Sequence, residues 1–298
     1  MAGNILSTLS TFEGVSQNNI ATRTINPVGV LHGIQFGFFK NDGTALTWAE
    51  LITDVESIFI KIGGDTAFEM TPTEIGHYLN YYLLGTNPAS AIFHLPLKPF
   101  WWANTALANQ LAWGTAGIGN GQIVANIRFK NVTLQTSRVE CNMDSTANRQ
   151  PLGAYMQIKR FPFAQDAAGT ISLDTFPLEE EVAVLGYLIT RETAGIKALI
   201  TSVEMRFDSV AQREEIAPIY LDRWAQMRNK NPLANMLPID LNVDGNAADF
   251  VRLSQVARQR LLIKSSGALG NFTVVRIAAT GVSPAQPAIA QIAPAVAA

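Results

Sequence analysis

The chain has 298 residues, of which 48% are apolar and 15% are charged, and its formal net charge is −2. That length suits about two domains of ordinary size. The apolar content excludes a chain that is disordered throughout, and the near-neutral charge excludes a basic field that could hold duplex nucleic acid or an anionic membrane. Typical globular proteins carry about 25% charged residues, so the low charge indicates a surface that other subunits cover.

The chain contains a single cysteine, Cys141. This excludes a disulfide within the chain and a metal site built from several cysteines. No uninterrupted apolar run reaches about 18 residues, so we expect no membrane-spanning helix. The segment from Met1 to Leu6 has neither the basic start nor the long apolar stretch of a secretory signal. We therefore expect the chain to stay in the cytoplasm where it is made, unless it leaves inside an assembly.

The two ends differ in composition from the rest of the chain. Residues 1–24 are rich in Ser, Thr and Asn, which predicts an arm that is ordered only against a partner. Residues 283–298 combine three prolines with many alanines and no charge, which predicts a flexible, extended tail. Deletion of residues 1–20 is then expected to leave a folded protein.

Between the ends, short apolar runs separated by Gly- and Asp-containing turns predict a series of strands. They lie at 34–38, 58–62, 123–129 with a continuation at 132–134, 155–158, 198–200, 203–207 and 272–277. Content dominated by strands favours packed β-sandwiches, an all-β fold, over a doubly wound sheet.

Four short helices are predicted among the strands. Thr71, Pro72 and Glu74 open the first with a capping threonine, a proline at the first helical position and a glutamate three residues after the cap. The second covers residues 218–227 and carries Tyr220, Leu221 and Trp224 on one side. Segments 101–112 and 246–257 supply the others, and residues 256–264 fit a helix or a strand.

Three matches recur in the same order along the chain. They pair 51–56 with 199–204, 69–72 with 215–218, and 95–96 with 237–238, at offsets of 148 (199 minus 51), 146 (218 minus 72) and 142 (237 minus 95). Strands rich in Val and Ile, near 123–129 and 272–277, are expected to close the two halves. The shared order and the near-constant offset predict two tandem homologous domains.

Two loops match ligand-binding patterns in part. The glycine-rich segment 114–121 lacks the following helix that a phosphate loop requires, which favours a flexible loop between strands. Residues Asp240 to Asp244 match the first half of a calcium-binding loop, but its twelfth position is Val251 in place of glutamate. We interpret them as an Asx-rich turn, and a partial Ca²⁺ site completed by waters or a neighbouring chain is the alternative.

The histidines His32, His77 and His94 stand at no metal-ligand spacing, and Cys141 has no histidine close to it in sequence. We therefore predict no catalytic, cofactor-binding or metal-binding residue. The acidic run 179–181 is interpreted as a solvated face, and pairing between subunits is the alternative.

Basic residues gather in one late segment, at Arg252, Arg258, Arg260 and Lys264. They lack the interleaved aromatic residues of a nucleic-acid surface, so no specific nucleic acid is expected as a partner.

Aromatic residues gather in another segment, at Phe93, Phe100, Trp101, Trp102 and Trp113. A ligand platform is one interpretation. Buried packing, within a domain or between subunits, is favoured because Trp is enriched at both places. Trp102→Asp is then expected to disrupt folding or association.

Three segments resemble those of a known family. They are 55–65 leading into 73–78, then 93–97 with Trp101 and Trp102, and 171–177. With the order of elements over roughly 25–282, they make the chain similar to the double jelly-roll major capsid proteins of tailless, icosahedral, membrane-containing bacteriophages, of the corticovirus, tectivirus and finnlakevirus type.

This resemblance implies two tandem eight-stranded jelly-roll β-sandwiches, a double jelly roll, with short inserted helices. The chain then divides into an N-terminal arm (1–24), a first jelly roll (25–145), a second jelly roll (146–282) and a C-terminal tail (283–298). The resemblance also implies a structural protein without enzyme activity or cofactor.

The same resemblance implies an assembly. A homotrimer of pseudo-hexagonal outline would tile an icosahedral virion shell and contact neighbouring capsomers and penton or minor capsid proteins. The terminal arms would contact neighbours or an internal membrane. The arm has no basic residue before Arg23, which argues against an electrostatic membrane anchor.

Two other classes stay open at this point. A tandem β-sandwich binding module, such as a phage spike, a fibre or a carbohydrate-binding protein, would need Trp101 and Trp102 exposed beside Asp and Asn. An enzyme on a jelly-roll scaffold would need the scattered histidines and a carboxylate to converge in space.

Overall fold

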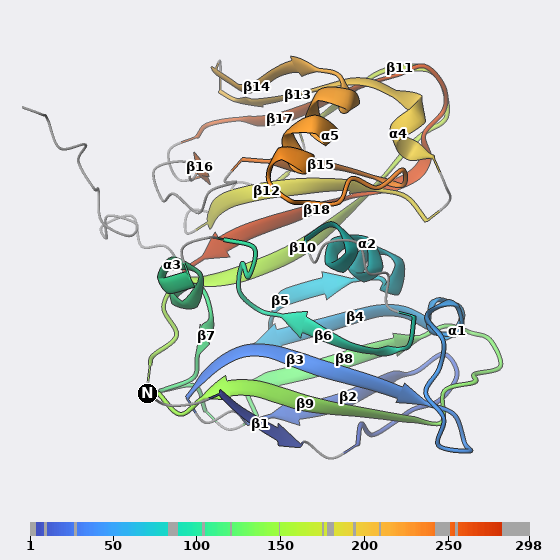
Figure 1. Ribbon diagram of the computed structural model, residues 1–298, viewed down its shortest axis with the longest axis vertical. Helices are drawn as coiled ribbons and strands as arrows, with labels where there is room; N and C mark the ends of the chain where they lie inside the picture. Colours follow the sequence, from blue (N-terminus) through green and yellow to red (C-terminus); the bar gives the residue numbers. More distant parts are fainter. Residues whose placement is uncertain are drawn as a thin grey trace, which may run out of the picture.

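The molecule is built from two β-sandwiches that lie side by side (Figure 1). The computed structural model describes residues 4–8, 11–26, 29–82, 89–102, 105–119, 121–148, 150–174, 176–177, 182–192, 195–208, 210–241, 251–253 and 256–281. The predicted tail 283–298 and the acidic run 179–181 lie outside these residues.

The first sandwich packs two four-stranded sheets against each other. One sheet has the strand order β1-β9-β3-β6, with the short β7 beside β3, and the other has the order β5-β4-β8-β2. The bounds are β1 Asn4–Thr8, β2 Ile20–Ile25, β3 Val30–Phe39, β4 Val55–Ile62, β5 Asp65–Met70, β6 Ile92–Pro96, β7 Trp113–Gly114, β8 Ile123–Phe129 and β9 Arg138–Thr146.

The second sandwich has the same construction. One sheet has the order β15-β12-β18-β10, with the short β16 beside β12, and the other has the order β11-β17-β13-β14. The bounds are β10 Tyr155–Gln165, β11 Gly169–Leu173, β12 Val182–Thr190, β13 Ile200–Phe207, β14 Val210–Ile216, β15 Met236–Asp240, β16 Val251–Arg252, β17 Gln259–Ser265 and β18 Gly270–Thr280.

Two helices of the first half, α1 and α2, occupy the places that α4 and α5 occupy in the second. The bounds are α1 Trp48–Asp54, α2 Pro72–Tyr82, α3 Thr105–Gln110, α4 Ile196–Leu199 and α5 Pro218–Met227. The series β2-β3-α1-β4-β5-α2-β6-β8-β9 repeats as β11-β12-α4-β13-β14-α5-β15-β17-β18, and β1 pairs with β9 as β10 pairs with β18. The predicted all-β fold of two tandem eight-stranded sandwiches is therefore confirmed, and so is the internal repeat.

The two halves share one sheet. β10 pairs in parallel with β5 through Ile158 and Phe68, and pairs antiparallel with β18. The sheet of β2, β8, β4 and β5 therefore continues into β18, β12 and β15, from the lower half of Figure 1 into its upper half. β12 is buried along its whole length because Val184 and Ile189 face the core of the second half, whereas Leu185 and Leu188 face that of the first.

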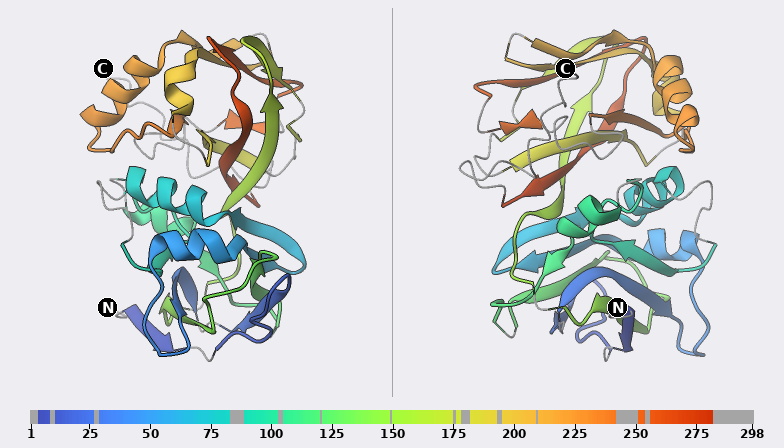
Figure 2. Two further views of the ribbon diagram at one scale, coloured as in Figure 1. Left: turned by 90° about the vertical axis from the view of Figure 1, so that its right-hand side faces the viewer. Right: turned by 60° about the vertical axis from the view of Figure 1, so that its left-hand side comes forward.

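The principal helices lie on one side of the two sandwiches. Figure 2 shows α1, α2 and α5 stacked along that side, with α2 next to the boundary between the halves. The predicted capping box opens α2, since Thr71 N–H donates to Glu74 Oε2 at 2.8 Å and Glu74 N–H donates to Thr71 Oγ1 at 3.2 Å. These bonds satisfy two backbone donors that would otherwise lack a partner at the helix start.

The structure corrects the prediction for the N-terminal residues. β1 pairs with β9 and β2 pairs with β8, and Phe12 and Ala21 are buried in the core of the first half. An arm ordered only against a partner is therefore wrong for the residues described between 4 and 24. β2 is an edge strand with only one face buried, so its other positions are free to be Thr or Arg, and the segment looks polar in sequence.

Several smaller predictions also change. β8 corresponds to β17, and not to residues 272–277, which lie in β18; both strands are rich in apolar residues, so composition alone does not separate them. Residues 132–134 form no strand, and residues 198–199 end the helix α4. The helix predicted at 101–112 shortens to α3. Of the helix predicted at 246–257, the described residues 251–252 form the strand β16.

We expect Phe12→Ala to destabilise the protein strongly. The Phe12 ring is buried and lies 6.1 Å from the Phe36 ring, centroid to centroid. Truncation of a buried Phe lowers the free energy of unfolding by about 3–5 kcal/mol. Urea unfolding of the variant measures this loss, and Glu13→Ala, at the exposed neighbouring position, is the control. A variant as stable as the wild-type protein would restore the interpretation of a dispensable arm.

Candidate functional site

The boundary between the two halves holds a group of buried polar side chains around α2. Arg160 on β10 donates two hydrogen bonds to Glu74 on α2, from Nε to Oε2 at 3.1 Å and from Nη2 to Oε1 at 3.1 Å. The Glu74 side chain is only 4% exposed, so solvent screens the attraction between the two charges of this bidentate ion pair only weakly. It fixes the start of α2 against the second half.

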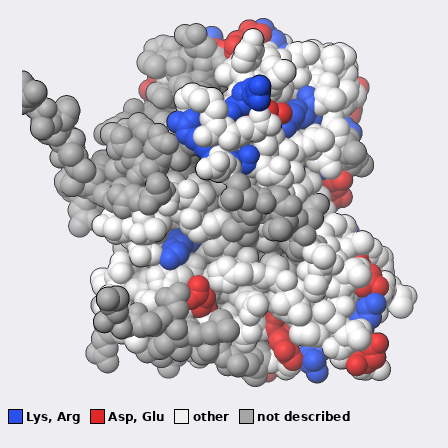
Figure 3. Space-filling model, viewed as in Figure 1, with Lys and Arg blue, Asp and Glu red and all other residues white. Residues whose placement is uncertain are grey.

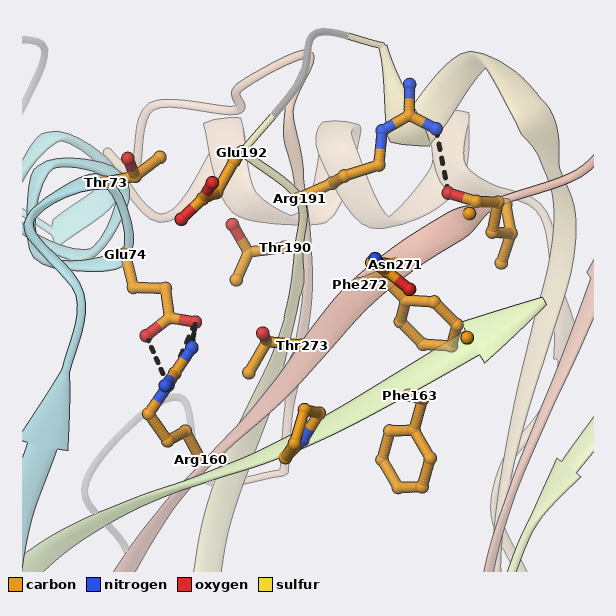
Figure 4. Close-up of a pocket in the computed structure, with 14 residues that line it drawn as sticks. Thr73, Glu74, Arg160, Phe163, Thr190, Arg191, Glu192, Asn271, Phe272 and Thr273 are labelled. Carbon is orange, nitrogen blue, oxygen red and sulfur yellow. Dashed lines mark hydrogen bonds and ion pairs between the residues drawn. The ribbon is translucent and has the colours of Figure 1, made fainter. Parts of the chain in front are cut away.

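A cleft of about 790 Å³ opens beside this ion pair. Its lining comes from α2, β10, β12 and β18, with Thr190 and Thr273 between the two sandwiches. Figure 4 shows Glu74 and Arg160 turned toward each other, while Arg191 turns away toward the backbone of Leu269. Glu74, Arg160 and Arg191 are thus engaged within the protein, which is the arrangement of a structural joint.

His77 makes the next contact along α2. Its Nδ1 lies 2.7 Å from the hydroxyl oxygen of Thr190 on β12. Burial lowers the pKa of His77 to about 4, because the imidazolium form would lose its hydration there. The neutral ring is therefore the form that joins α2 to β12 near neutral pH.

We expect His77 to make stability depend on pH. Its pKa in the folded state lies below the ordinary value of 6.5, so the unfolded chain takes up a proton first as the pH falls. Between pH 7 and pH 5 the wild-type protein should lose about 1–2 kcal/mol more stability than His77→Gln, which keeps a hydrogen-bonding side chain without a proton equilibrium in this range. Urea titrations at both pH values measure the difference, and equal losses would contradict it.

The end of α2 is held by a buried charge. Asp240 at the end of β15 accepts hydrogen bonds from the hydroxyl groups of Tyr81 at 2.7 Å and Tyr82 at 3.0 Å, and from Lys230 Nζ at 2.7 Å. Both members of the Asp240–Lys230 ion pair are buried. The Lys230 ammonium also lies 4.8 Å from the centroid of the Tyr82 ring. The two halves are thereby joined at both ends of α2.

Asp240 was the first position of the partial calcium pattern. Both of its carboxylate oxygens accept hydrogen bonds from side chains of this chain, which favours a structural role over metal binding. Residues 242–250, which would complete the loop, lie outside the described part of the chain. Among the described residues, no group of three His, Cys, Asp or Glu side chains is placed to hold a metal ion.

The aromatic residues predicted to pack together do so. Phe93, Trp102 and Trp113 are buried, and Trp113 Nε1 donates to the carbonyl of Met156 at 3.1 Å. Trp101 is half-buried and stacks on Tyr82 with ring centroids 3.9 Å apart. The described geometry therefore favours core packing over a ligand platform.

Among the other candidate residues, His32 and His94 come together in the first half: burial lowers the pKa of each, and the charges of Lys98 and Asp144 act on both. His32 contacts Thr146, His94 lies 3.9 Å from Asp144, and Cys141 is buried in the first core. Burial raises the pKa of the Cys141 thiol to about 12, so it is protonated at neutral pH.

The glycine-rich segment 114–121 connects β7 to β8, as a loop between strands. Of the late basic residues, Arg258 pairs with Asp174 at 2.9 Å and Lys264 pairs with Glu215 at 2.6 Å. None of the helices in the described part of the chain is long and apolar enough to span a membrane.

Comparison with known proteins identifies the family of this chain. The sequence model of the family described as "Viral coat protein P2 N-terminal domain" matches residues 6–159, more than half of the chain. The chain belongs to the viral coat protein P2 family. The matched range ends within β10, the strand that joins the two halves. No curated protein sequence matches the chain.

Solved capsid proteins share the whole fold of this coat protein. The major capsid protein P2 of bacteriophage PM2 superposes with a TM-score of 0.77 at 13% identity, over 95% of this chain and 99% of that one. The MCP of STIV, the Sulfolobus turreted icosahedral virus, gives a TM-score of 0.65 at 11% identity, over 98% and 99%. The PBCV-1 virus capsid structure gives 0.63 at 8% identity, over 95% and 96%.

These similarities confirm the predicted resemblance to double jelly-roll capsid proteins. The chain is a viral coat protein, its place is in the virion, and it assembles with other coat subunits. The functional residues that sequence reasoning missed are those of the joint, above all Arg160, Thr190 and Lys230. The capping box at Thr71 was the one local signal that pointed to it.

Proposed function

We propose that three copies of this coat protein form a capsomer of pseudo-hexagonal outline that tiles an icosahedral shell. The observation that carries the proposal is the topological repeat: one chain presents two similar sandwiches side by side, sharing a sheet. Three such chains around an axis place six similar units in a ring, a closed arrangement that leaves no open end.

The surface supports the same proposal. Uncharged residues dominate the described part of the face in Figure 3, in keeping with 15% charged residues in the chain. A surface of this kind suits extensive contact with further subunits, which would be neighbouring capsomers and penton or minor capsid proteins.

The ends of the chain and the underlying membrane complete the proposal. Because residues 4–8 and 20–25 are strands of the first half, residues 283–298 are the segment we assign to contacts with neighbours or with an internal membrane. We assign the chain no catalytic activity, cofactor or specific nucleic-acid partner, in keeping with a family of structural proteins. A carbohydrate-binding module would need an exposed Trp102, and Trp102 is buried.

The mass of the purified protein in solution tests the proposal. Light scattering at several concentrations should give about 97 kDa, three times the chain mass of 32.3 kDa. Negative-stain images of the same fraction should show particles of hexagonal outline. A mass of one chain at every concentration would contradict the capsomer.

A further inference from the structure

The helix α5 carries an apolar face that none of the described residues covers. The side chains of Ile219, Tyr220, Trp224 and Met227 are 67%, 65%, 44% and 80% exposed. All but Ile219 line a groove of about 350 Å³ that reaches Pro238 and Asp240 at the end of β15. Lys and Arg side chains gather over the same part of the second half (Figure 3). Four exposed large apolar residues on one short helix indicate a contact surface.

The internal repeat shows what kind of contact this is. α5 occupies in the second half the place that α2 occupies in the first, and both begin with a proline, at an offset of 146 (218 minus 72). That offset aligns four positions of α2 with four of α5: Thr73 with Ile219, Glu74 with Tyr220, His77 with Arg223, and Tyr81 with Met227.

These four α2 positions face the second half. Glu74 binds Arg160, His77 contacts Thr190, Tyr81 binds Asp240, and Thr73 lines the cleft between the halves together with Glu192. Three of the four exposed apolar residues of α5, Ile219, Tyr220 and Met227, thus repeat the face with which α2 packs against a neighbouring sandwich, whereas Trp224 corresponds to Tyr78, which is buried in the first core. The described residues form no third sandwich that could cover this face of α5.

The repeat also locates the surface that would receive α5. The two prolines Pro96 on β6 and Pro238 on β15 are equivalent in the repeat. Pro96 lies opposite Gly33, and Pro238 lies opposite Leu188, so Gly33 corresponds to Leu188. Two residues further along each strand, Gln35 in the first half corresponds to Thr190 in the second. Gln35 lies on the outer face of the sheet, where its side-chain oxygen accepts a hydrogen bond from Asn142 on β9. Gln35 of a second copy is therefore the residue that Arg223 of α5 would contact, as His77 contacts Thr190 within one chain.

This outer face offers an apolar patch in the matching place. Gly37 lies two residues after Gln35, and the ring of Phe39 lies over it. A Cβ added at Gly37 would come within 2.9 Å of that ring and 3.8 Å of the Ile92 side chain. Ile92 is 43% exposed. Gly37 corresponds to Glu192, which lines the same cleft as Thr73. Because Ile219 is the counterpart of Thr73, it would contact this patch. Apolar residues then meet apolar residues.

We propose that α5 of one copy packs against the outer face of β3 and β6 of a second copy, in the arrangement that α2 takes against β12 and β15 within one chain. This inference rests on the proposed trimer and names the surfaces that hold it together. Each contact between chains repeats the contact within a chain, so a single packing mode alternates around the ring.

Charge substitutions on α5 test this docking. Ile219→Glu combined with Met227→Glu should abolish the 97 kDa species and leave a folded single chain of 32.3 kDa. The control is Ile20→Glu on β2, which places a glutamate at an apolar residue that is 40% exposed and lies outside the proposed contact, and it should keep the trimer. Far-UV circular dichroism confirms that each variant is folded. A trimeric α5 variant would overturn the inference and leave the trimer standing, whereas a monomeric wild-type protein would overturn the trimer itself.

Cross-linking tests the receiving surface. A chain with both Gln35→Cys and Arg223→Cys, treated with a short bismaleimide, should give covalent trimers on a denaturing gel. A mixture of the two single variants should stop at dimers, and either single variant alone should give no cross-linked product, since Cys141 is buried. If the double variant is trimeric in solution but yields no covalent product, α5 docks elsewhere and the inference fails.

Discussion

Asp240→Ala should lower the free energy of unfolding by about 3–5 kcal/mol, because it removes the partner of a buried ammonium group. Lys230 is 7% exposed, and its Nζ lies 2.7 Å from Asp240 Oδ2. The substitution also leaves the hydroxyl groups of Tyr81 and Tyr82 without the acceptor that they share. Urea unfolding at pH 7 and one fixed protein concentration measures the loss, since association links stability to concentration.

Asp174→Ala is the matched control for this effect. Asp174 pairs with Arg258 at 2.9 Å at the surface of the same half, where the two side chains are 37% and 57% exposed. Surface ion pairs contribute about 0–1 kcal/mol, so this variant should stay near wild-type stability. Equal, small effects of the two substitutions would show that the Asp240 group is not a joint between the halves.

A double substitution completes this comparison. Asp240→Leu with Lys230→Met removes both charges and keeps apolar bulk, so it should be more stable than Asp240→Ala. A double variant as unstable as the single one would assign the loss to the tyrosine hydroxyl groups, which lack an acceptor in both variants.

The sequence predicted what is encoded locally. Thr71, Pro72 and Glu74 stand within one turn of each other, and their capping box forms as predicted. The tandem repeat was visible because equivalent elements recur in a fixed order, whatever the distance between them. Fold class and repeat were therefore accessible before any coordinates.

The joint between the halves was not accessible in this way. His77 and Thr190 are 113 residues apart, and Tyr81 and Asp240 are 159 residues apart, so no local pattern links them. His77 looks in sequence like any histidine on a helix. Only the shared sheet through β10 brings α2 against β12 and β15.

Helix α5 shows a different limit of sequence reasoning. The prediction placed Tyr220, Leu221 and Trp224 on one side of the helix. In the structure Leu221 is buried, whereas Tyr220 and Trp224 are exposed. The helix thus has two apolar faces, one for its own sandwich and one left outside. A periodic pattern reports apolar positions without telling which chain covers them.

Trp102→Asp should abolish cooperative folding. The Trp102 side chain is 3% exposed and belongs to the core of the first half. Loss of a buried Trp removes about 3–5 kcal/mol, and a carboxylate at that site adds the penalty for a buried charge. The sum approaches the total stability of a typical domain, about 5–15 kcal/mol. Far-UV circular dichroism with a thermal scan measures the result, and Trp102→Phe, which keeps an apolar ring, should retain a folded protein.

The same substitution at an exposed tryptophan separates folding from assembly. Trp224 on α5 is 44% exposed, and its ring stacks with the guanidinium of Arg228 at 3.9 Å. Trp224→Asp should keep the circular dichroism spectrum of the wild-type protein and lose the trimer, whereas Trp102→Asp should lose both. A folded, trimeric Trp102→Asp variant would show that Trp102 is not part of a packed core. The contrast follows from position alone: one tryptophan is buried within the chain, and the other faces outward on the helix that we assign to the next copy.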